Sequence, residues 1–442
     1  MSTVYLGTLA HLRGNPFESA DALEIIEAGA LWVDEAGRII DYGEQGQILP
    51  KASGAKAEDY GEGWLLPGLI DGHIHFPQYY ATAAYGGQLL DWLVRSVLPA
   101  EMAYADADFA QDAAGRFVNH LLACGTTTAM VFGSQFFQAN EALFLAAHHA
   151  GIRMIAGPTL MDLPAPGIPA GLLVSASKAQ EEAEAFIARC RAEPLLHYAI
   201  TPRYALSCSS AMMELCADLL RANPETYLQT HINENHGEIQ AVSRHFAQAL
   251  GYLAVYERFG LVTERTVLAH NIHATEAELM RLAQARCSVC HCPSSNLYLG
   301  SGLFPLAAHL RHGIDVGVGT DIGAGTNFSV WNNLSDAYKI QQLQGFTLDS
   351  ARLLYLGTLG GAKALRLEHE TGNFEPGKSA DFFMLDGAEN PYLAERLRRC
   401  ESLSEQLFCL LHLATERAVG ATYVAGRRVY RSDSEGFGER PF

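Results

Sequence analysis

Two histidines follow an apolar run early in the chain, in the segment Pro67-Gly-Leu-Ile-Asp-Gly-His73-Ile-His75. Side chains alternate along a β-strand, so His73 and His75 point to the same face of such a strand. Two imidazoles at the end of one strand supply half of a site for a divalent metal ion. Because the chain holds 17 histidines, such a pair can arise by chance. Its meaning depends on what other strands place beside it.

The segments that must position this pair alternate between short apolar runs and longer stretches with helical periodicity. Eight strands are predicted, at Leu69–His75, Thr126–Gly133, Arg153–Met161, Leu195–Tyr204, Tyr227–Asn233, Thr266–Ile272, Ser288–Ser295 and Asp315–Asp321. Helices are predicted between them, for example at Ala107–Ala123, Ala176–Ala192, Thr275–Ala285 and Leu303–His312. Eight such units in series predict an α/β fold with a parallel (β/α)8 TIM barrel. An open doubly wound sheet is the alternative, but its typical Gly-x-Gly-x-x-Gly turn does not follow the first strand.

The two ends of the chain depart from this pattern, because they hold β-rich runs around glycine-containing turns, for example at 30–42 and 421–430. Neither end is long enough to bury a good core alone, so we expect the two ends to pair into one small β-sandwich. The predicted domains are therefore residues 1–68 and 368–442, which form the halves of the sandwich, and residues 69–367, which form the barrel.

Other titratable side chains lie near the ends of predicted strands, where barrel enzymes hold their active sites. His231 lies at the end of the fifth strand, His270 at the end of the sixth and Asp321 at the end of the eighth. Each of them alone has an ordinary explanation, such as a buried histidine or an aspartate in a turn. Their occurrence at the same end of several strands, together with His73 and His75, favours one metal site.

Imidazoles combined with one carboxylate suit Zn²⁺, with Fe²⁺ as the alternative. Such an ion lowers the pKa of a bound water toward neutrality. Two-metal sites in related barrels need a lysine, usually at the end of the fourth strand, and Leu195–Tyr204 contains none. The sequence therefore predicts one divalent metal ion per subunit.

Three further side chains near these strand ends can contact a substrate. Glu234 lies three residues after His231 and can act there as a general acid or base, or else complement the dipole of the following helix. Arg203 can donate to two adjacent acceptors of a ligand, with a structural salt bridge as the equal alternative. Gln78 offers an amide that both donates and accepts hydrogen bonds.

The composition excludes some partners. The formal net charge of −18 disfavours a nucleic acid partner, because an acidic surface repels phosphate backbones. The first residues lack the features of a secretory signal, and no apolar run approaches the ~18 residues that a membrane span needs. We therefore expect no membrane partner, and a cytoplasmic protein in which the nine cysteines are reduced.

The motifs, taken together over nearly the whole chain, resemble the amidohydrolase superfamily and, within it, the guanine deaminases. The matching segments are 67–78, 201–209, 231–235, 291–296, 319–321 and 372–382. The His-x-His and Thr-Asp motifs are typical of the superfamily, whereas Thr201-Pro-Arg-Tyr204 with Gln78 indicates guanine. The chain departs from the pattern at Gly72, where relatives often carry Thr, and in the run Ile322–Gly325.

This resemblance implies hydrolytic deamination of free guanine to xanthine and ammonia, by water that the metal activates. It implies metal ligation by His73, His75, His231 and Asp321, with His270 beside the metal, either as a ligand or as a catalytic group. Glu234, His270 and Asp321 are the implied catalytic residues, and Gln78, Arg203 and Tyr204 the implied guanine contacts. A homodimer is expected from the resemblance alone.

Two alternatives remain open from the sequence. One is an amidohydrolase that acts on another aminated heterocycle, such as cytosine, adenine, an 8-oxopurine or a halogenated triazine. The other is a metal-binding barrel that sequesters purines, or a scaffold subunit, without catalysis. Glu234 argues against the second alternative, because a protein that only binds purines has no use for a general base.

Overall fold

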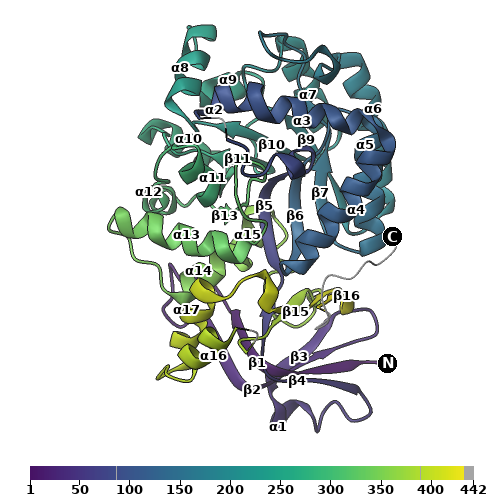
Figure 1. The fold of residues 1–442 in the computed structure, drawn as a ribbon, viewed down its shortest axis with the longest axis vertical. Coiled ribbons are helices and arrows are strands. Elements are labelled where there is room, and N and C mark those ends of the chain that lie inside the picture. Colours follow the sequence, from purple (N-terminus) through teal and green to yellow (C-terminus); the bar gives the residue numbers. More distant parts are fainter. Residues whose placement is uncertain (86, 389, 433–442) are drawn as a thin grey trace. The chain divides into compact units, whose positions relative to one another are not determined.

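Parallel strands follow one another around a nearly closed barrel in the computed structural model (Figure 1). The strands are β5 (Leu69–His75), β6 (Thr126–Phe132), β7 (Arg153–Gly157), β9 (Leu196–Pro202), β10 (Tyr227–Ile232), β11 (Thr266–His270), β12 (Ser288–His291) and β13 (Val316–Val318), and the two-residue β8 (Thr159–Leu160) pairs with β9. Their order in the sheet follows their order in the chain. Backbone hydrogen bonds also join β5 to the segment after β13, from Asp321 N to His73 O at 2.8 Å and from His75 N to Ile322 O at 3.0 Å. The predicted TIM barrel is confirmed.

Helices fill the connections between the strands, and two of them, α4 (Ala107–Ala123) and α6 (Ala176–Ala192), have the predicted bounds. The others are α2 (Leu89–Trp92), α3 (Leu98–Met102), α5 (Phe137–Ala150), α7 (Ser210–Ala222), α8 (His236–His245), α9 (Leu253–Arg258), α10 (Glu276–Gln284), α11 (Pro293–Tyr298) and α12 (Leu306–Arg311). The start of α10 is fixed by a capping box, in which Thr275 accepts from the backbone of Glu278 and the Glu278 side chain accepts in return.

Prolines explain where the predicted elements were too long. The predicted strand Ser288–Ser295 ends at His291, because Pro293 begins α11 and its fixed φ suits the first turn of a helix. The predicted strand Arg153–Met161 is divided into β7 and β8 at Pro158, which has no N–H for the ladder. The predicted helix Leu303–His312 begins only after Pro305, at α12.

A second, mixed sheet combines strands from both ends of the chain, so the two ends pair as predicted, and they do so within one seven-stranded sheet. Its order is β16-β15-β14-β4-β1-β2-β3. The strands are β1 (Thr3–Leu12), β2 (Leu23–Val33), β3 (Ile39–Glu44), β4 (Lys56–Pro67), β14 (Phe382–Leu385), β15 (Val419–Val424) and β16 (Arg427–Arg431). The N-terminal β4 pairs with the C-terminal β14, and Tyr5, Leu65 and Phe382 share one buried cluster.

The sequence analysis did not predict the helices that accompany this sheet. They are α1 (Gln45–Ile48), α13 (Val330–Leu343), α14 (Ser350–Gly357), α15 (Leu359–Ala364), α16 (Pro391–Leu397) and α17 (Leu403–Leu413). The last two lie between β14 and β15, inside the segment that was expected to be β-rich. The indole of Trp331 on α13 donates to the Leu410 carbonyl on α17 at 2.8 Å, so a tertiary hydrogen bond links α13 to α17.

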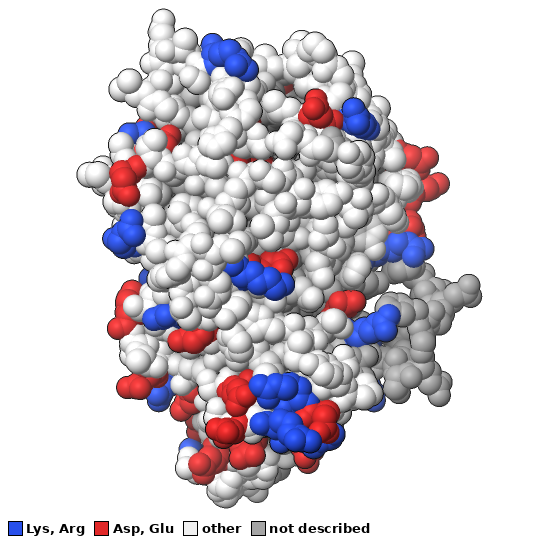
Figure 2. Space-filling view, turned by 60° about the vertical axis from the view of Figure 1, so that its left-hand side comes forward, with Lys and Arg blue, Asp and Glu red and all other residues white. Residues whose placement is uncertain are grey.

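The structure describes residues 1–85, 87–388 and 390–432. The chain divides into one compact unit of Met1–Asp71, Asn119–Thr128 and Ser329–Phe442, described up to residue 432, and another of Gly72–Val118 and Ala129–Phe328. None of the helices in the described ranges is long and apolar enough to cross a membrane. On the face shown in Figure 2, basic side chains are interspersed with acidic ones rather than gathered in one patch.

Candidate active site

Five predicted side chains converge at the carboxyl ends of four barrel strands. His73 and His75 end β5, His231 lies near the end of β10, His270 ends β11, and Asp321 follows β13. Asp321 Oδ1 lies 3.3 Å from the Nε2 atoms of both His73 and His75. The Nε2 atoms of His75 and His231 are 3.2 Å apart, and His270 Nε2 lies 3.7 Å from Asp321 Oδ2. The structure therefore brings all five groups together.

Four of these groups have the geometry of a metal site. His73, His231, His270 and Asp321 each offer one ligand atom, and these atoms lie within 4.8 Å of one another. The ligand set predicted from the sequence has His75 in place of His270. Since His75 is within hydrogen-bond distance of His231 and Asp321, the choice between the two imidazoles stays a prediction.

The hydrogen bonds around the cluster suit a divalent cation. A carbonyl or amide oxygen can only accept, so His231 Nδ1 donates to Arg203 O at 2.6 Å and His270 Nδ1 donates to Asn296 Oδ1 at 2.9 Å. Both rings then present the lone pair of Nε2 to the cluster, which is the form that binds metal. His270 Nε2 is buried and has no hydrogen-bond partner among the described residues, as a metal-facing nitrogen requires.

The electrostatics of the cluster point the same way. Burial lowers the pKa of His75 to about 4 and that of His231 well below its usual value, so both rings are neutral. Burial alone raises the pKa of Asp321, but hydrogen bonds from His73 and His75 outweigh burial and hold the pKa well below its usual value. Neutral imidazoles and an ionised carboxylate are the protonation states that bind Zn²⁺ or Fe²⁺.

Backbone conformation marks the same strand ends. His270, Asn271 and Asp321 have φ values of 68°, 49° and 49°, and Asn233 after β10 has a φ of 50°. Residues with a Cβ rarely adopt this left-handed region, which costs about 1–3 kcal/mol per residue. The fold holds His270 and Asp321 in this unfavourable conformation where their side chains meet in the cluster, whereas Asn233 donates to Asn271 at 3.1 Å. Strain of this kind concentrates at functional sites.

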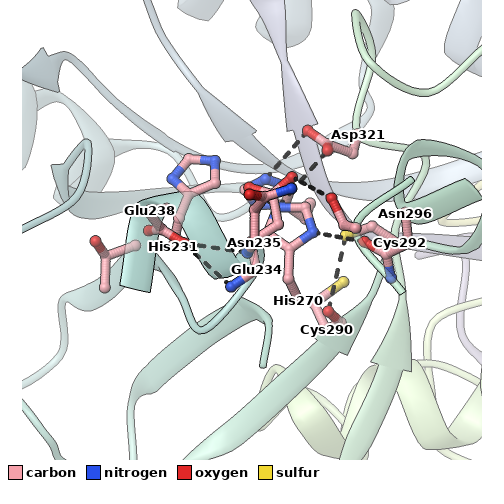
Figure 3. Close-up of polar contacts among 12 residues, drawn as sticks. His231, Glu234, Asn235, Glu238, His270, Cys290, Cys292, Asn296 and Asp321 are labelled. Atoms are coloured by element: carbon pink, nitrogen blue, oxygen red, sulfur yellow. Dashed lines mark hydrogen bonds and ion pairs between the residues drawn. The ribbon is translucent and has the colours of Figure 1, made fainter. Parts of the chain in front are cut away.

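Glu234 faces the same space from the loop after β10 (Figure 3). Its Oε2 lies 3.5 Å from His270 Nε2, and Ser301 Oγ donates to its Oε1 at 3.4 Å. Burial raises the pKa of Glu234 well above its usual value, and the nearby carboxylates Glu238 and Asp321 raise it further. A carboxyl group with a raised pKa can both take and return a proton near neutral pH.

A pocket with about 430 Å³ of empty space, including the solvent at its entrance, opens beside these groups. Its walls include the predicted residues His75, Gln78, Arg203, Tyr204, His231, Glu234, His270 and Asp321, and the apolar Leu89, Trp92, Leu93 and Leu299. His73 lies against Asp321 behind this lining. Apolar walls with a few converging polar groups are typical of a small-molecule site.

Arg203 is fully buried, and its guanidinium pairs with a carboxylate that the sequence analysis did not single out. Arg203 Nη1 donates to Glu101 Oε2 at 2.7 Å. Gln78 Nε2 donates to Glu101 Oε1 at 3.1 Å. Burial opposes the ionisation of Glu101, but the charge and hydrogen bond of Arg203 outweigh burial and keep the pKa of Glu101 below its usual value. The two explanations considered for Arg203 therefore coexist, since it forms an ion pair and also lines the pocket.

Residues 64–429 match the Amidohydrolase family. This chain belongs to the amidohydrolase family. A probable guanine deaminase of Deinococcus radiodurans is 42% identical over 439 residues, which cover 98% of this chain and 99% of that protein. The solved structure of E. coli guanine deaminase is similar with a TM-score of 0.94 at 39% identity, covering 98% of this chain and 100% of that one. A guanine deaminase from C. acetobutylicum, solved with guanine bound in the active site, gives a TM-score of 0.89 at 25% identity, covering 97% and 100%.

The resemblance to amidohydrolases is thereby confirmed. Membership of the family and the cluster of three histidines and one aspartate together imply a divalent metal ion. The described residues of the cluster fit that implication, because they offer neutral imidazoles, an ionised carboxylate and a buried nitrogen facing inward.

Two buried carboxylates next to the pocket of this amidohydrolase escaped the sequence analysis. Glu238 on α8 accepts from the backbone N–H groups of Glu234 and Asn235, at 3.2 Å and 3.4 Å, and from Tyr252 Oη at 2.6 Å. The spacing Asn235-x-x-Glu238 is a capping-box pattern, so a signal for it was present in the sequence. Glu101 carries no such signal, because an acidic residue in a short amphipathic helix is ordinarily exposed.

Proposed function

We propose that this amidohydrolase catalyses the hydrolytic deamination of guanine to xanthine and ammonia. The observation that carries the proposal is that a buried glutamate, a cluster of histidines with one aspartate, and a buried arginine converge on one pocket. The names of the relatives support guanine as the substrate, since they are guanine deaminases over nearly the full length of the chain.

The residues proposed to hold the metal are His73, His75, His231 and Asp321, with Zn²⁺ as the proposed ion and Fe²⁺ as the alternative. When bound, the ion supplies Lewis-acid activation of the attacking water. His270 is proposed to stand beside it and to stabilise the charge that develops on the substrate.

Glu234 is the proposed proton carrier. It accepts a proton from water as the new C–O bond forms at C2 of guanine, and it delivers that proton to the neighbouring ring nitrogen. Asp321 then takes the proton of the new hydroxyl group and passes it to the amino group. The C–N bond breaks, the C2 carbonyl forms, and ammonia leaves. Both protons of the water are thus accounted for.

Arg203 and Gln78 are proposed to recognise the other edge of the base. The donors of Arg203 that do not face Glu101 match two adjacent acceptors, which O6 and N7 of guanine provide. Tyr204 lines the same pocket and is proposed to contact the ring. Adenine presents a donor where guanine presents O6, so one donor of the guanidinium is left without an acceptor.

Ammonia release from a panel of aminated bases tests the proposal. We expect release from guanine that exceeds release from adenine, cytosine, an 8-oxopurine and a halogenated triazine by at least about 10²-fold, because a buried donor without its acceptor is costly. A different preferred base would contradict the assignment of guanine while leaving deamination intact. Absence of ammonia release from all of them, by protein that contains metal, would contradict catalysis itself.

Three finer expectations accompany the proposal. We propose the cytoplasm as the location, a homodimer as the assembly, and the domain bounds 1–68, 69–367 and 368–442. They rest on the sequence and on the family resemblance.

A further inference from the structure

The side of the pocket that carries Arg203 and Gln78, here called the recognition side, is connected by one buried carboxylate. Glu101 lies on α3 and is 1% exposed. Its Oε2 accepts from Arg203 Nη1 at 2.7 Å and from Gln135 Nε2 at 2.8 Å, and its Oε1 accepts from Gln78 Nε2 at 3.1 Å. These hydrogen bonds satisfy both oxygens of a charge that would otherwise be very costly to bury.

The three partners of Glu101 follow three different strands of the barrel. Gln78 lies in the 3-10 turn after β5, Gln135 lies three residues after β6, and Arg203 follows β9 directly. Glu101 itself belongs to none of these strands. A single side chain therefore links side chains that follow three different strands, and two of these side chains are proposed substrate contacts.

The contact with Glu101 also fixes the orientation of the Gln78 amide. A carboxylate can only accept, so the NH₂ group of Gln78 faces Glu101. The backbone N–H of Gly323 donates to Gln78 Oε1 at 3.2 Å from the opposite side. One N–H and one lone pair of the amide remain for a ligand, and the amide cannot exchange them by rotation without losing both contacts.

The charge of the recognition side follows from the same pair. Arg203 is 4% exposed and Glu101 is 1% exposed, so solvent screens neither charge well. Together they sum to zero, whereas an unpaired guanidinium in this place would attract an anion. Gln78 and Gln135, the other partners of Glu101, carry no charge.

We infer that Glu101 is a positioning residue that sets substrate selectivity: it aims Arg203 and Gln78 at the base, and it neutralises the guanidinium so that an uncharged purine is preferred over an anionic one. This inference rests on the proposed function. The two ligands differ in charge. Free guanine enters the pocket neutral, whereas the ring of the product xanthine loses a proton more readily than that of guanine and so can become anionic.

The test uses full-length, metal-loaded enzyme and compares Glu101→Gln and Glu101→Asp with the wild type. Glu278→Gln is the matched control, because Glu278 is also a buried carboxylate with several hydrogen bonds, but at the start of α10. Ammonia release gives kcat and KM for guanine. Direct calorimetric titration with xanthine, at pH values where its ring is neutral and where it is anionic, gives the affinity for each form.

For Glu101→Gln we expect the KM for guanine to rise about 10- to 100-fold with a smaller change in kcat, because a recognition contact rather than the reacting centre is disturbed. We expect the preference for neutral over anionic xanthine to fall by about 10-fold, since the guanidinium keeps its charge. Glu101→Asp should keep the wild-type preference, and Glu278→Gln should alter neither quantity. A purely structural role would not move the preference between two charge forms of one ligand.

An unchanged KM and an unchanged preference in Glu101→Gln would overturn the inference. If that variant does not fold, Gln135→Leu is the deciding test, because it removes one donor to Glu101 without leaving a charge unpaired. We expect the KM for guanine to rise about 3- to 5-fold in this variant. An unchanged KM would overturn the inference. The proposed function fails separately, when the wild type releases no ammonia from guanine. The titrations with xanthine still report the charge preference in that case.

Discussion

The pocket has two sides, and each is organised around a buried carboxylate. On the metal side, Asp321 lies among imidazoles that strand ends provide. On the recognition side, Glu101 lies among a guanidinium and two amides and comes from a short helix. The central carboxylate of the metal side follows a barrel strand, whereas the central carboxylate of the recognition side lies on a helix in the connection between β5 and β6. In barrels of this kind the connections carry the variation that changes substrate while the chemistry stays the same.

The largest effect is expected from Asp321→Asn, which removes the only carboxylate of the His73, His231, His270 and Asp321 group. We expect loss of the metal and at least about 10³-fold lower kcat, because a proposed ligand and the group proposed to pass the second proton to the amino group are lost together. Elemental analysis and ammonia release measure the two effects. A variant with full metal content and full activity would contradict the assignment of Asp321 as a metal ligand.

The second prediction separates the proton carrier from the ligands. Glu234→Gln keeps the shape of the side chain, so we expect full metal content with about 10²- to 10⁴-fold lower kcat. The hydrogen bond from Ser301 can be kept, so the fold should be unaffected. Melting temperature and metal content serve as controls, and substantial activity in folded, metal-loaded protein would refute the role of Glu234.

The third prediction concerns Asn296. It hydrogen-bonds to a residue of the metal side, as Glu101 does to residues of the recognition side. Its Oδ1 accepts from His270 Nδ1 and so holds the ring in place. We expect Asn296→Ala to lower kcat about 10- to 100-fold with little change in KM, as the loss of a hydrogen bond to a metal-site histidine does. Asn373→Ala, which removes a buried amide from the other compact unit, should leave kcat unchanged. If Asn296→Ala raised KM without lowering kcat, the metal side would not differ from the recognition side in the kinetic constant it affects.

The smallest effect is expected from Arg203→Lys, which keeps the charge next to Glu101 but loses the planar fork of donors. We expect KM for guanine to rise about 10-fold and kcat to change little, since one donor of a paired set is lost. Initial rates over a range of guanine concentrations measure this. A fall in kcat at constant KM would instead place Arg203 on the reacting side.

The metal side was predictable from the sequence because its residues are tied to elements that periodicity reveals. His73, His75, His231, His270 and Asp321 all lie at strand ends that the apolar runs mark. The structure also places the predicted Glu234, Gln78, Arg203 and Tyr204 in the pocket wall. Their catalytic and binding roles stay predictions, as do the domain bounds.

The rest was not predictable because it depends on contacts between distant segments. Glu101 is 102 positions from Arg203 along the chain, and nothing in the local sequence of α3 distinguishes it from an exposed acidic residue. The α16 and α17 helices were missed because the segment was judged by its flanking β-rich runs. The capping box at Asn235 and Glu238 could have been recognised, since its spacing places a glutamate at the start of a helix close to Glu234.

The central claim, that one divalent ion in the histidine and aspartate cluster supports deamination of guanine, is tested most directly by reconstitution. Metal-free protein is titrated with Zn²⁺, and ammonia release from guanine is followed after each addition. The account predicts no activity at the start, a linear rise up to one equivalent of Zn²⁺ per chain, and no further rise beyond it. Full activity in metal-free protein, or a rise that continues to two equivalents, would contradict the account.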